Sequence, residues 1–462
     1  MKQIYEDLLK KIPDYSSFLT ADEMDESSRK LASEYPDIVE LFSFGKSRAG
    51  HDLLCLKVGS GSKNALVFGL PHPNEPIGTA MIEFFSRQLA ENESLRNELD
   101  YTWYFVKAWD RDGYELNSGW IKGPYTLYQY SRNFFRPAAR QQVDWTFPID
   151  YKDLHFHDVM PEAEAMMHLI DQVRPHMIYS LHNSGFGGVY WYVTYDIPHA
   201  IYDTLYEAPR RNQLPIHFGE PESPALKQFY PAVFEGGGIQ VEYDYLEKFG
   251  VQDIPAVINS GTCSDEYAYN LCKSLTFLTE MPYFYDARIQ DLTPSDTKRK
   301  EAILEKCRWT LASNQRLREA IAPIRDIMQD DNPFFMAIMD HTKDQSTLAQ
   351  MKMAQEDPAY DVPATEAEKF DNLYLNRFYR LLTYGMLIRA HEWELERLSA
   401  QGCSAIEQER LLKSGLDNAI SMHAQLADTL EHEFQYSVIP IRKLVAVQLE
   451  CGLKIAEYVK TL

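Results

Sequence analysis

The sequence predicts an α/β protein with a mixed, mostly parallel sheet flanked by helices, followed by an all-α C-terminal extension. Two observations carry this prediction. From residue 1 to about 290, short apolar runs of strand length alternate with helical stretches, which is typical of a sheet covered by helices on both faces. Beyond about residue 290, strand-like runs disappear and helical spacing takes over. The chain is therefore expected to divide into an α/β domain, 1–290, and a helical domain, 291–462.

The predicted elements of the first part follow one another in a regular order. Strands are expected at 52–61, 65–71, 101–110, 176–185 and 274–286, and helices at 79–92 and 161–175. The first helix places Met81, Ile82, Phe85 and Leu89 at helical spacing. The second carries acidic residues in its first turn, where their negative charges interact favourably with the positive end of the helix dipole. The alternation predicts a sheet whose functional groups gather at the carboxyl ends of its strands.

The extension is predicted to consist of long helices. Helical patterns cover 295–330, 366–401, 405–435 and 439–462, with a linker near 357–371. The third is the clearest, because apolar residues from Leu412 to Phe434 recur at steps of three and four. Its apolar faces leave three roles open, which are a homo-oligomer interface, a lid and a docking surface for a partner.

Composition excludes some classes of partner. The 462 residues include 46 Lys and Arg against 68 Asp and Glu, a formal net charge of −22, which argues against nucleic acid and anionic membrane surfaces. The six cysteines form no C-x-x-C pair, which is typical of free thiols in a reducing compartment. The first residues lack the apolar stretch of a signal peptide, and no run of 18 apolar residues occurs. We therefore expect a cytoplasmic protein.

A turn after one predicted strand carries metal-ligating residues. His72 and Glu75 stand three residues apart in "GLPHPNEPIG", between a buried strand and a helix. His182 in "SLHNSG" ends another buried strand about a hundred residues later, and Glu280 lies near the end of a third. A catalytic zinc ion needs three protein ligands and one open position. An isolated H-x-x-E pair is common by chance, so the rest of the chain must support the metal site.

Seven segments resemble the zinc carboxypeptidases, the M14 metallopeptidase family, in family order over residues 40–285. They are "FGKSRAGHDLLCLKVGSG" (44–61), "GLPHPNEPIG" (69–78), "DRDGYELNSGW" (110–120), "YSRNFFRP" (130–137), "PEAEAM" (161–166), "SLHNSG" (180–185), and "SGTCSDEYAYN" (260–270) followed by "LTFLTEMP" (275–282). The resemblance implies a carboxypeptidase-like fold for this part. It leaves the helical extension unexplained.

The resemblance also implies roles for individual residues. His72, Glu75 and His182 would bind one Zn²⁺ per chain, and Glu280 would act as general base on a zinc-activated water. Zinc is not the only metal that such His and Glu ligands accept.

Substrate-binding residues follow from the same resemblance. Arg132 would clamp the carboxylate of the substrate, because a guanidinium fork pairs with it bidentately, and Asn133 would hold the loop. The chain departs from the family at Ser131, where the family has an asparagine. After the motif tryptophan, the family has an arginine that polarises the substrate carbonyl. This chain has Lys122 near that position, and its ammonium group lacks the planar fork of a guanidinium. Asp265 or Glu266 falls at the specificity position, where an acid favours a basic residue.

The resemblance implies a zinc metallocarboxypeptidase that hydrolyses a C-terminal peptide or amide bond, and the composition adds the expectation that it is cytoplasmic. The implied partner is a peptide or peptide-like substrate with a free carboxylate. One alternative is a zinc-dependent deacylase or amidase acting on N-acyl amino acids, similar to the succinylglutamate desuccinylase and aspartoacylase group. The other is a catalytically inactive peptide-binding protein.

Overall fold

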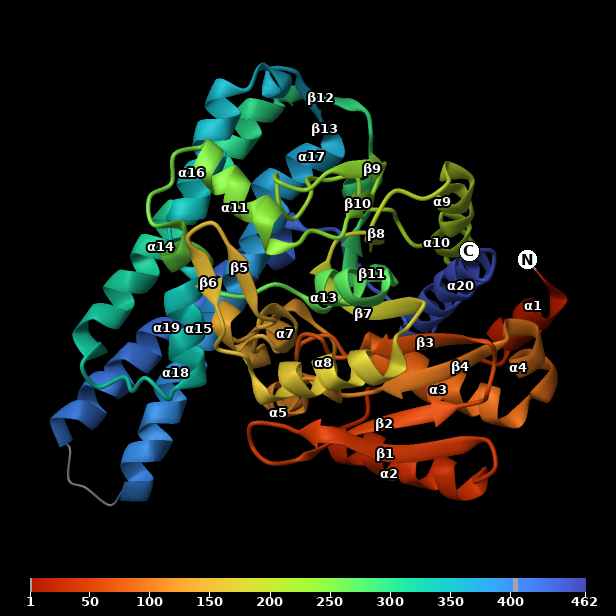
Figure 1. Cartoon of the computed structure of the whole chain (residues 1–462). Coiled ribbons are helices and arrows are strands. Elements are labelled where there is room, and N and C mark those ends of the chain that lie inside the picture. The colour runs from red at the N-terminus through yellow and green to blue at the C-terminus, as the bar shows by residue number, and fades with distance from the viewer. Residues whose placement is uncertain (1, 402–405) are drawn as a thin grey trace.

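The computed structural model describes residues 2–401 and 406–462, and a ten-stranded mixed sheet runs through its centre (Figure 1). In spatial order the main path is β1 (Val39–Lys46), β2 (Asp52–Val58), β4 (Tyr101–Val106), β3 (Lys63–Phe68), β7 (Met177–Phe186), β11 (Leu275–Asp286), β8 (Tyr190–Val193), β10 (Val233–Glu235) and β9 (Gln228–Tyr230). The central strands β4, β3, β7 and β11 run parallel to one another. This arrangement confirms the predicted fold class.

Alternating side chains of the central strands pack against helices on opposite faces of the sheet. Leu66 and Phe68 of β3 belong to one buried cluster, together with α8 (Pro161–Val173) and α13 (Ser264–Cys272). Ala65 and Val67 belong to the other, together with α3 (Ile77–Glu91) and α20 (Ile441–Val459). Successive strand residues point to opposite faces. Both faces of the central strands are therefore largely apolar, and polar groups gather toward their carboxyl ends.

The C-terminal region is mainly helical, as predicted. It contains α14 (Arg299–Ile321), α15 (Pro333–His341), α16 (Gln345–Glu356), α17 (Glu366–Phe370), α18 (Asn376–Gln401) and α19 (Ile406–Glu433). The predicted start of the third helix at residue 405 lies outside the described residues. Three short strands were not predicted: β12 (Pro294–Lys298) pairs with β13 (Pro363–Thr365), and β14 (Tyr436–Val438) extends the sheet at β11. Each is too short to show a period of two.

The last helix lies apart from the other C-terminal helices. α20 contacts α3, α1 (Gln3–Lys10) and the sheet, and Figure 1 shows it beside the two chain ends. The helices α14–α19 instead gather at the opposite side of the sheet. The division at residue 290 stays a prediction, since the region 291–462 contributes to both places.

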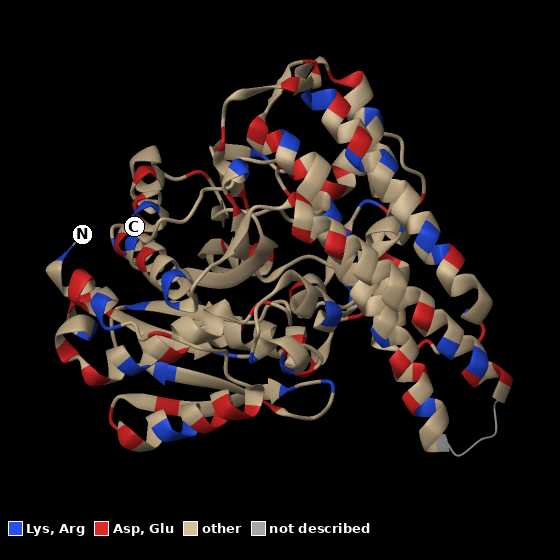
Figure 2. Cartoon of the chain, turned by 180° about the vertical axis from the view of Figure 1, so that it is seen from behind, with Lys and Arg blue, Asp and Glu red and all other residues tan. Residues whose placement is uncertain are grey.

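Charge and apolar residues are distributed as expected for a sheet enclosed by helices. Lys, Arg, Asp and Glu mark the outer helices, while the strands between them are largely free of charge (Figure 2). Within residues 2–401 and 406–462, none of the helices combines the length and apolar character needed to span a bilayer.

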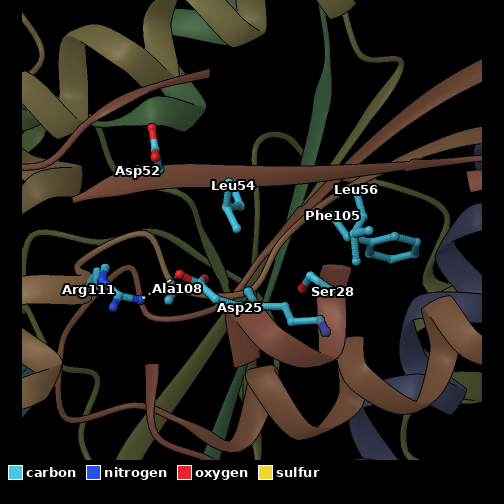
Figure 3. Close-up of a pocket in the computed structure, with 9 residues that line it drawn as sticks. Asp25, Ser28, Asp52, Leu54, Leu56, Phe105, Ala108 and Arg111 are labelled. Carbon is cyan, nitrogen blue, oxygen red and sulfur yellow. Dashed lines mark hydrogen bonds and ion pairs between the residues drawn. The ribbon is translucent and has the colours of Figure 1, made fainter. Parts of the chain in front are cut away.

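A small hollow of about 10 Å³ lies where α2 (Ala21–Glu34) meets β2 and β4 (Figure 3). Leu54 and Leu56 of β2 face Asp25 of α2 across it, and Arg111 donates a hydrogen bond to Asp25 at 3.1 Å. The hollow holds no more than a water molecule. The large cavity of the protein lies elsewhere, at the carboxyl ends of the central strands.

Candidate metal centre and the cavity around it

The turn between β3 and α3 places His72 and Glu75 above the sheet. β3 ends at Phe68 and α3 begins at Ile77, so the intervening residues form the turn that the sequence predicted. The start of α3 lies directly on β7, because a Cβ at Gly78 would stand 2.4 Å from Leu181 Cβ. This close approach brings the turn next to His182, which follows Leu181 in β7.

The structure brings together the three predicted metal ligands. One donor atom from each of His72, Glu75 and His182 lies within 4.8 Å of the others, and all three residues are buried. His182 Nδ1 lies 3.0 Å from Glu75 Oε2, and the two imidazole ring centroids are 5.0 Å apart. Among the described residues, the buried His72 Nδ1 has no hydrogen-bond partner.

This ligand set suits a divalent metal ion. Burial, together with the positive charge of Arg136, lowers the pKa of His72 well below its usual value and keeps the imidazole neutral. A neutral imidazole has a lone pair free for a metal. Two histidines and one carboxylate are a common ligand set of catalytic zinc. The residues present therefore fit the zinc ion that the resemblance implies.

Glu280 lies beside these ligands. It is the register partner of His182 in the parallel pair β7 and β11, and its Oε1 lies 3.7 Å from His182 Nδ1. Burial, followed by the negative charges of Glu222 and Glu75, raises the pKa of Glu280 well above its usual value. Its Oε2 is buried without a hydrogen-bond partner in the described part of the chain. A carboxyl group in this setting is suited to exchanging a proton.

Two residues that the sequence did not suggest hold the ligands in place. The backbone N–H of Asn183 donates to Glu75 Oε2 at 3.2 Å, and Asn183 Oδ1 accepts from Ile77 N at 3.0 Å. The Tyr283 hydroxyl lies 2.7 Å from Asn183 Oδ1 and 2.9 Å from the carbonyl oxygen of Asn74, and these two oxygens share its one proton. The sequence signal for them was position alone, since Asn183 follows His182 directly and Tyr283 lies three residues after Glu280.

Arg136 contacts the ligands directly and was also missed. Its Nη1 donates to Glu75 Oε1 at 2.9 Å, its Nε donates to Gln142 Oε1 at 3.1 Å, and its guanidinium carbon lies 5.4 Å from the ring centroid of Trp145. Arg136 stands in "YSRNFFRP", four residues after the arginine on which the sequence prediction rested. The segment that carries the motif therefore contacts a candidate metal ligand through Arg136.

The predicted substrate residues Arg132 and Asn133 lie elsewhere. Both belong to α7 (Leu127–Asn133), and neither is among the described residues that line the cavity. Arg132 forms an ion pair with Glu392 of α18, and Asn133 Nδ2 donates to the carbonyl oxygen of Gln129 at 2.9 Å. Their substrate roles stay predictions. Lys122 also lies away from the cavity, where it pairs with Glu23 at 2.6 Å.

A cavity of about 910 Å³ contains the metal ligands and Glu280. One wall comes from the sheet, the turn at 72–75 and the loops around 217–226 and 257–265. The other comes from the C-terminal helices, which contribute Lys306, Thr310, Asp340, His341, Arg380 and Thr383. The extension that the resemblance left unexplained is thus part of the wall of the site.

Carboxyl groups without a cationic partner gather on the sheet side of the cavity. Burial raises the pKa of Asp144 to about 6 and that of Asp265 to about 7. Asp265 accepts a hydrogen bond from Thr194 Oγ1 at 2.6 Å, and Glu222 accepts hydroxyl hydrogen bonds from two tyrosines of β8. Among the described residues, no Lys or Arg forms an ion pair with these three acids. This end of the cavity suits a cationic group.

Comparisons with known proteins identify the family of the chain. A family model described as zinc carboxypeptidase matches residues 24–282, more than half of the chain. Carboxypeptidase A from Helicoverpa armigera is similar in structure, with 15% identity, coverage of 61% of this chain and 71% of that chain, and a TM-score of 0.39. A metallo-carboxypeptidase from Burkholderia cenocepacia has 14% identity, coverage of 57% and 60%, and a TM-score of 0.36. No curated protein matches the sequence.

Proposed function

This chain belongs to the zinc carboxypeptidase family, and we propose that it is a zinc-dependent metallocarboxypeptidase that hydrolyses a C-terminal peptide or amide bond. The observation that carries the proposal is the meeting of four residues in one cavity. His72, Glu75 and His182 offer donor atoms within 4.8 Å of one another, and Glu280 stands beside them. The inactive-binding alternative has less support, because ligands and base are both present.

The residues of the chain take distinct roles in the proposed reaction. His72, Glu75 and His182 would hold one Zn²⁺ ion, which, when bound, polarises a carbonyl group and lowers the pKa of water. Glu280 accepts a proton from the attacking water at a carboxylate oxygen and later passes it to the leaving amine nitrogen. Arg136, which already touches Glu75, brings a fixed positive charge to the place where negative charge develops on the substrate.

The acidic wall of the cavity supports a preference for a basic side chain in the substrate. Asp265 and Asp144 are enclosed by protein and carry no cation, so a bound ammonium or guanidinium group would pair with them. The cationic substrate would then relieve the cost of burying these carboxylates in the ionised form. We propose a peptide whose released C-terminal residue is Lys or Arg.

Metal content and activity test the proposal together. The native chain and Glu280→Gln are loaded with zinc, and each is incubated with a mixed library of C-terminally free peptides that is read by mass spectrometry. We expect one zinc per chain in both, with C-terminal trimming only by the native protein. Glu407→Gln, which removes an exposed carboxylate of α19, is the matched control and should trim normally.

Two results would contradict the proposal. A chain that takes up no zinc would remove the metal site and with it the mechanism. Zinc binding without trimming would instead favour the amidase alternative, which a screen of N-acyl amino acids would then test.

A further inference from the structure

The C-terminal extension places an arginine in the wall of the cavity. Arg380 belongs to α18, lines the cavity and is partly exposed to it. Its Nη1 donates to Asn314 Oδ1 at 2.9 Å and to the carbonyl oxygen of His341 at 3.1 Å. No carboxylate in the described ranges forms an ion pair with it. Burial lowers the pKa of Arg380 to about 10, so the side chain stays charged at neutral pH.

Arg380 and Arg136 face the same part of the cavity. Both line it, and both lie close enough to His341 to affect its pKa. Burial is the main cause that lowers the pKa of His341 to about 4, and the two positive charges lower it further, whereas Asp340 raises it. His341 is therefore neutral at pH 7. The nearby Asp340 is already paired with Lys343 at 2.7 Å and accepts the backbone N–H of Ala139. This end of the cavity is accordingly positive.

Contacts of α18 fix the two arginines relative to each other. Arg389, further along α18, donates to the carbonyl oxygens of Asn133 at 2.9 Å and Phe134 at 3.3 Å. These carbonyls lie three and two residues before Arg136 in the chain. The extension therefore holds the segment that carries Arg136 while it supplies Arg380 itself.

We propose that Arg380, supplied by the C-terminal extension, binds the free carboxylate of the substrate. The inference rests on the proposed carboxypeptidase function, and it is carried by elimination among three arginines. Arg132 is paired with Glu392 outside the cavity, and Arg136 is hydrogen-bonded to the metal ligand Glu75. Arg380 lines the cavity, and no carboxylate in the described ranges forms an ion pair with its guanidinium fork. The substrate would lie with its carboxylate toward the extension and its basic group toward Asp265.

Binding in the absence of turnover gives the sharpest test. Zinc-loaded Glu280→Gln is titrated by calorimetry with a peptide ending in Lys, as the free acid and as the C-terminal amide. We expect the free acid to bind more tightly. Adding Arg380→Gln should weaken binding of the free acid by about tenfold or more, since a charged hydrogen bond is lost, and should change binding of the amide little. Arg380→Lys should recover part of the preference, because it keeps the charge without the fork.

The matched control is Arg132→Gln in the same background, which should keep the preference for the free acid. The proposal is overturned if Arg380→Gln leaves the preference unchanged, if both peptides weaken equally, if Arg132→Gln abolishes the preference, or if neither peptide binds. If the preference for the free acid depends on Arg380 but the native protein trims no peptide, the peptidase is refuted and the carboxylate site is retained. If the native chain trims peptides but its preference for the free acid does not depend on Arg380, the peptidase is supported and the carboxylate site is refuted. Thermal unfolding and zinc content of each variant ensure that folded protein is compared.

Discussion

Gly385 of α18 lies against the backbone carbonyl oxygen of Ser131 in α7, so closely that a Cβ on Gly385 would stand 1.8 Å from that oxygen. The contact joins the extension to the family-matched region backbone to backbone. Gly385 lies in the same helix as Arg380, and Ser131 immediately precedes Arg132. Any residue other than glycine must push the two helices apart.

Gly385→Ala should therefore destabilise the protein. Glycine to alanine within a helix is normally favourable, so a loss would show that steric overlap outweighs helix propensity. We expect a loss of about 1–3 kcal/mol in the free energy of unfolding, as is typical for overpacking. Urea unfolding measures this change. Ser399→Ala, at an exposed position of the same helix, should have little effect, and an unchanged or raised stability of Gly385→Ala would contradict the contact.

A buried histidine beside this contact should make the stability depend on pH. His423 of α19 is hydrogen-bonded to Ser131 Oγ at 2.8 Å, and burial, together with the charge of Arg132, lowers its pKa to about 4. The unfolded chain takes up a proton at this residue below about pH 6.5, whereas the folded chain stays neutral down to about pH 4. Stability is therefore full above pH 6.5 and falls as the pH drops toward 4.

His423→Gln should flatten this dependence. The slope that one such histidine contributes is at most about 1.4 kcal/mol per pH unit, and His341, whose pKa is also about 4, adds a second contribution that the variant retains. Urea unfolding between pH 4.5 and 7.5 gives the slope for each protein. His168→Gln, an exposed position of α8, is the control. A slope that is the same in native protein and His423→Gln would show that this imidazole is accessible to protons in the folded state.

The electrostatics of Asp265 predict a pH dependence of specificity. Burial raises its pKa to about 7, and its ionised form exists mainly above that pH in the free protein. If Asp265 pairs with a basic side chain, the ratio of kcat/KM for a substrate ending in Lys to that for a neutral substrate should rise with pH through about 7. Taking the ratio cancels the titration of the catalytic groups. In Asp265→Asn the ratio should be low and independent of pH, and persistence of the rise would exclude Asp265 as its source.

The resemblance of several motifs to one family singled out His72, Glu75 and His182 as candidate metal ligands, and the structure brings the three side chains together. His72 and Glu75 lie in one turn, and His182 and Glu280 are register partners within the neighbouring parallel strands β7 and β11, so the pairing of these strands brings them together. The central apolar strands were predictable because both of their faces are buried. The short strands β12 to β14 were not, since three to five residues carry no period.

The wall formed by the extension could not be predicted. Arg380 lies 244 positions after Arg136 in the sequence, and helical periodicity shows which face of α18 is apolar without showing what that face covers. The motif around residue 132 directed attention to Arg132, whereas Arg136 turns toward Glu75. Side-chain direction at the end of a short helix depends on packing against α18, which is a tertiary contact.

Tyr283 should tune the metal affinity without touching the metal. Its hydroxyl holds Asn183 and the carbonyl oxygen of Asn74, and the backbone N–H of Asn183 in turn holds the ligand Glu75. Tyr283→Phe should weaken zinc binding by about tenfold, the lower range for loss of an outer hydrogen bond. Competition with a chromogenic chelator measures this affinity. Tyr125→Phe loses a comparable hydrogen bond to the carbonyl oxygen of Ile121 and is the control. A weaker metal site in Tyr283→Phe alone would assign the effect to the hydrogen bonds around Glu75, whereas equal affinities would show that the ligands hold their positions without Tyr283.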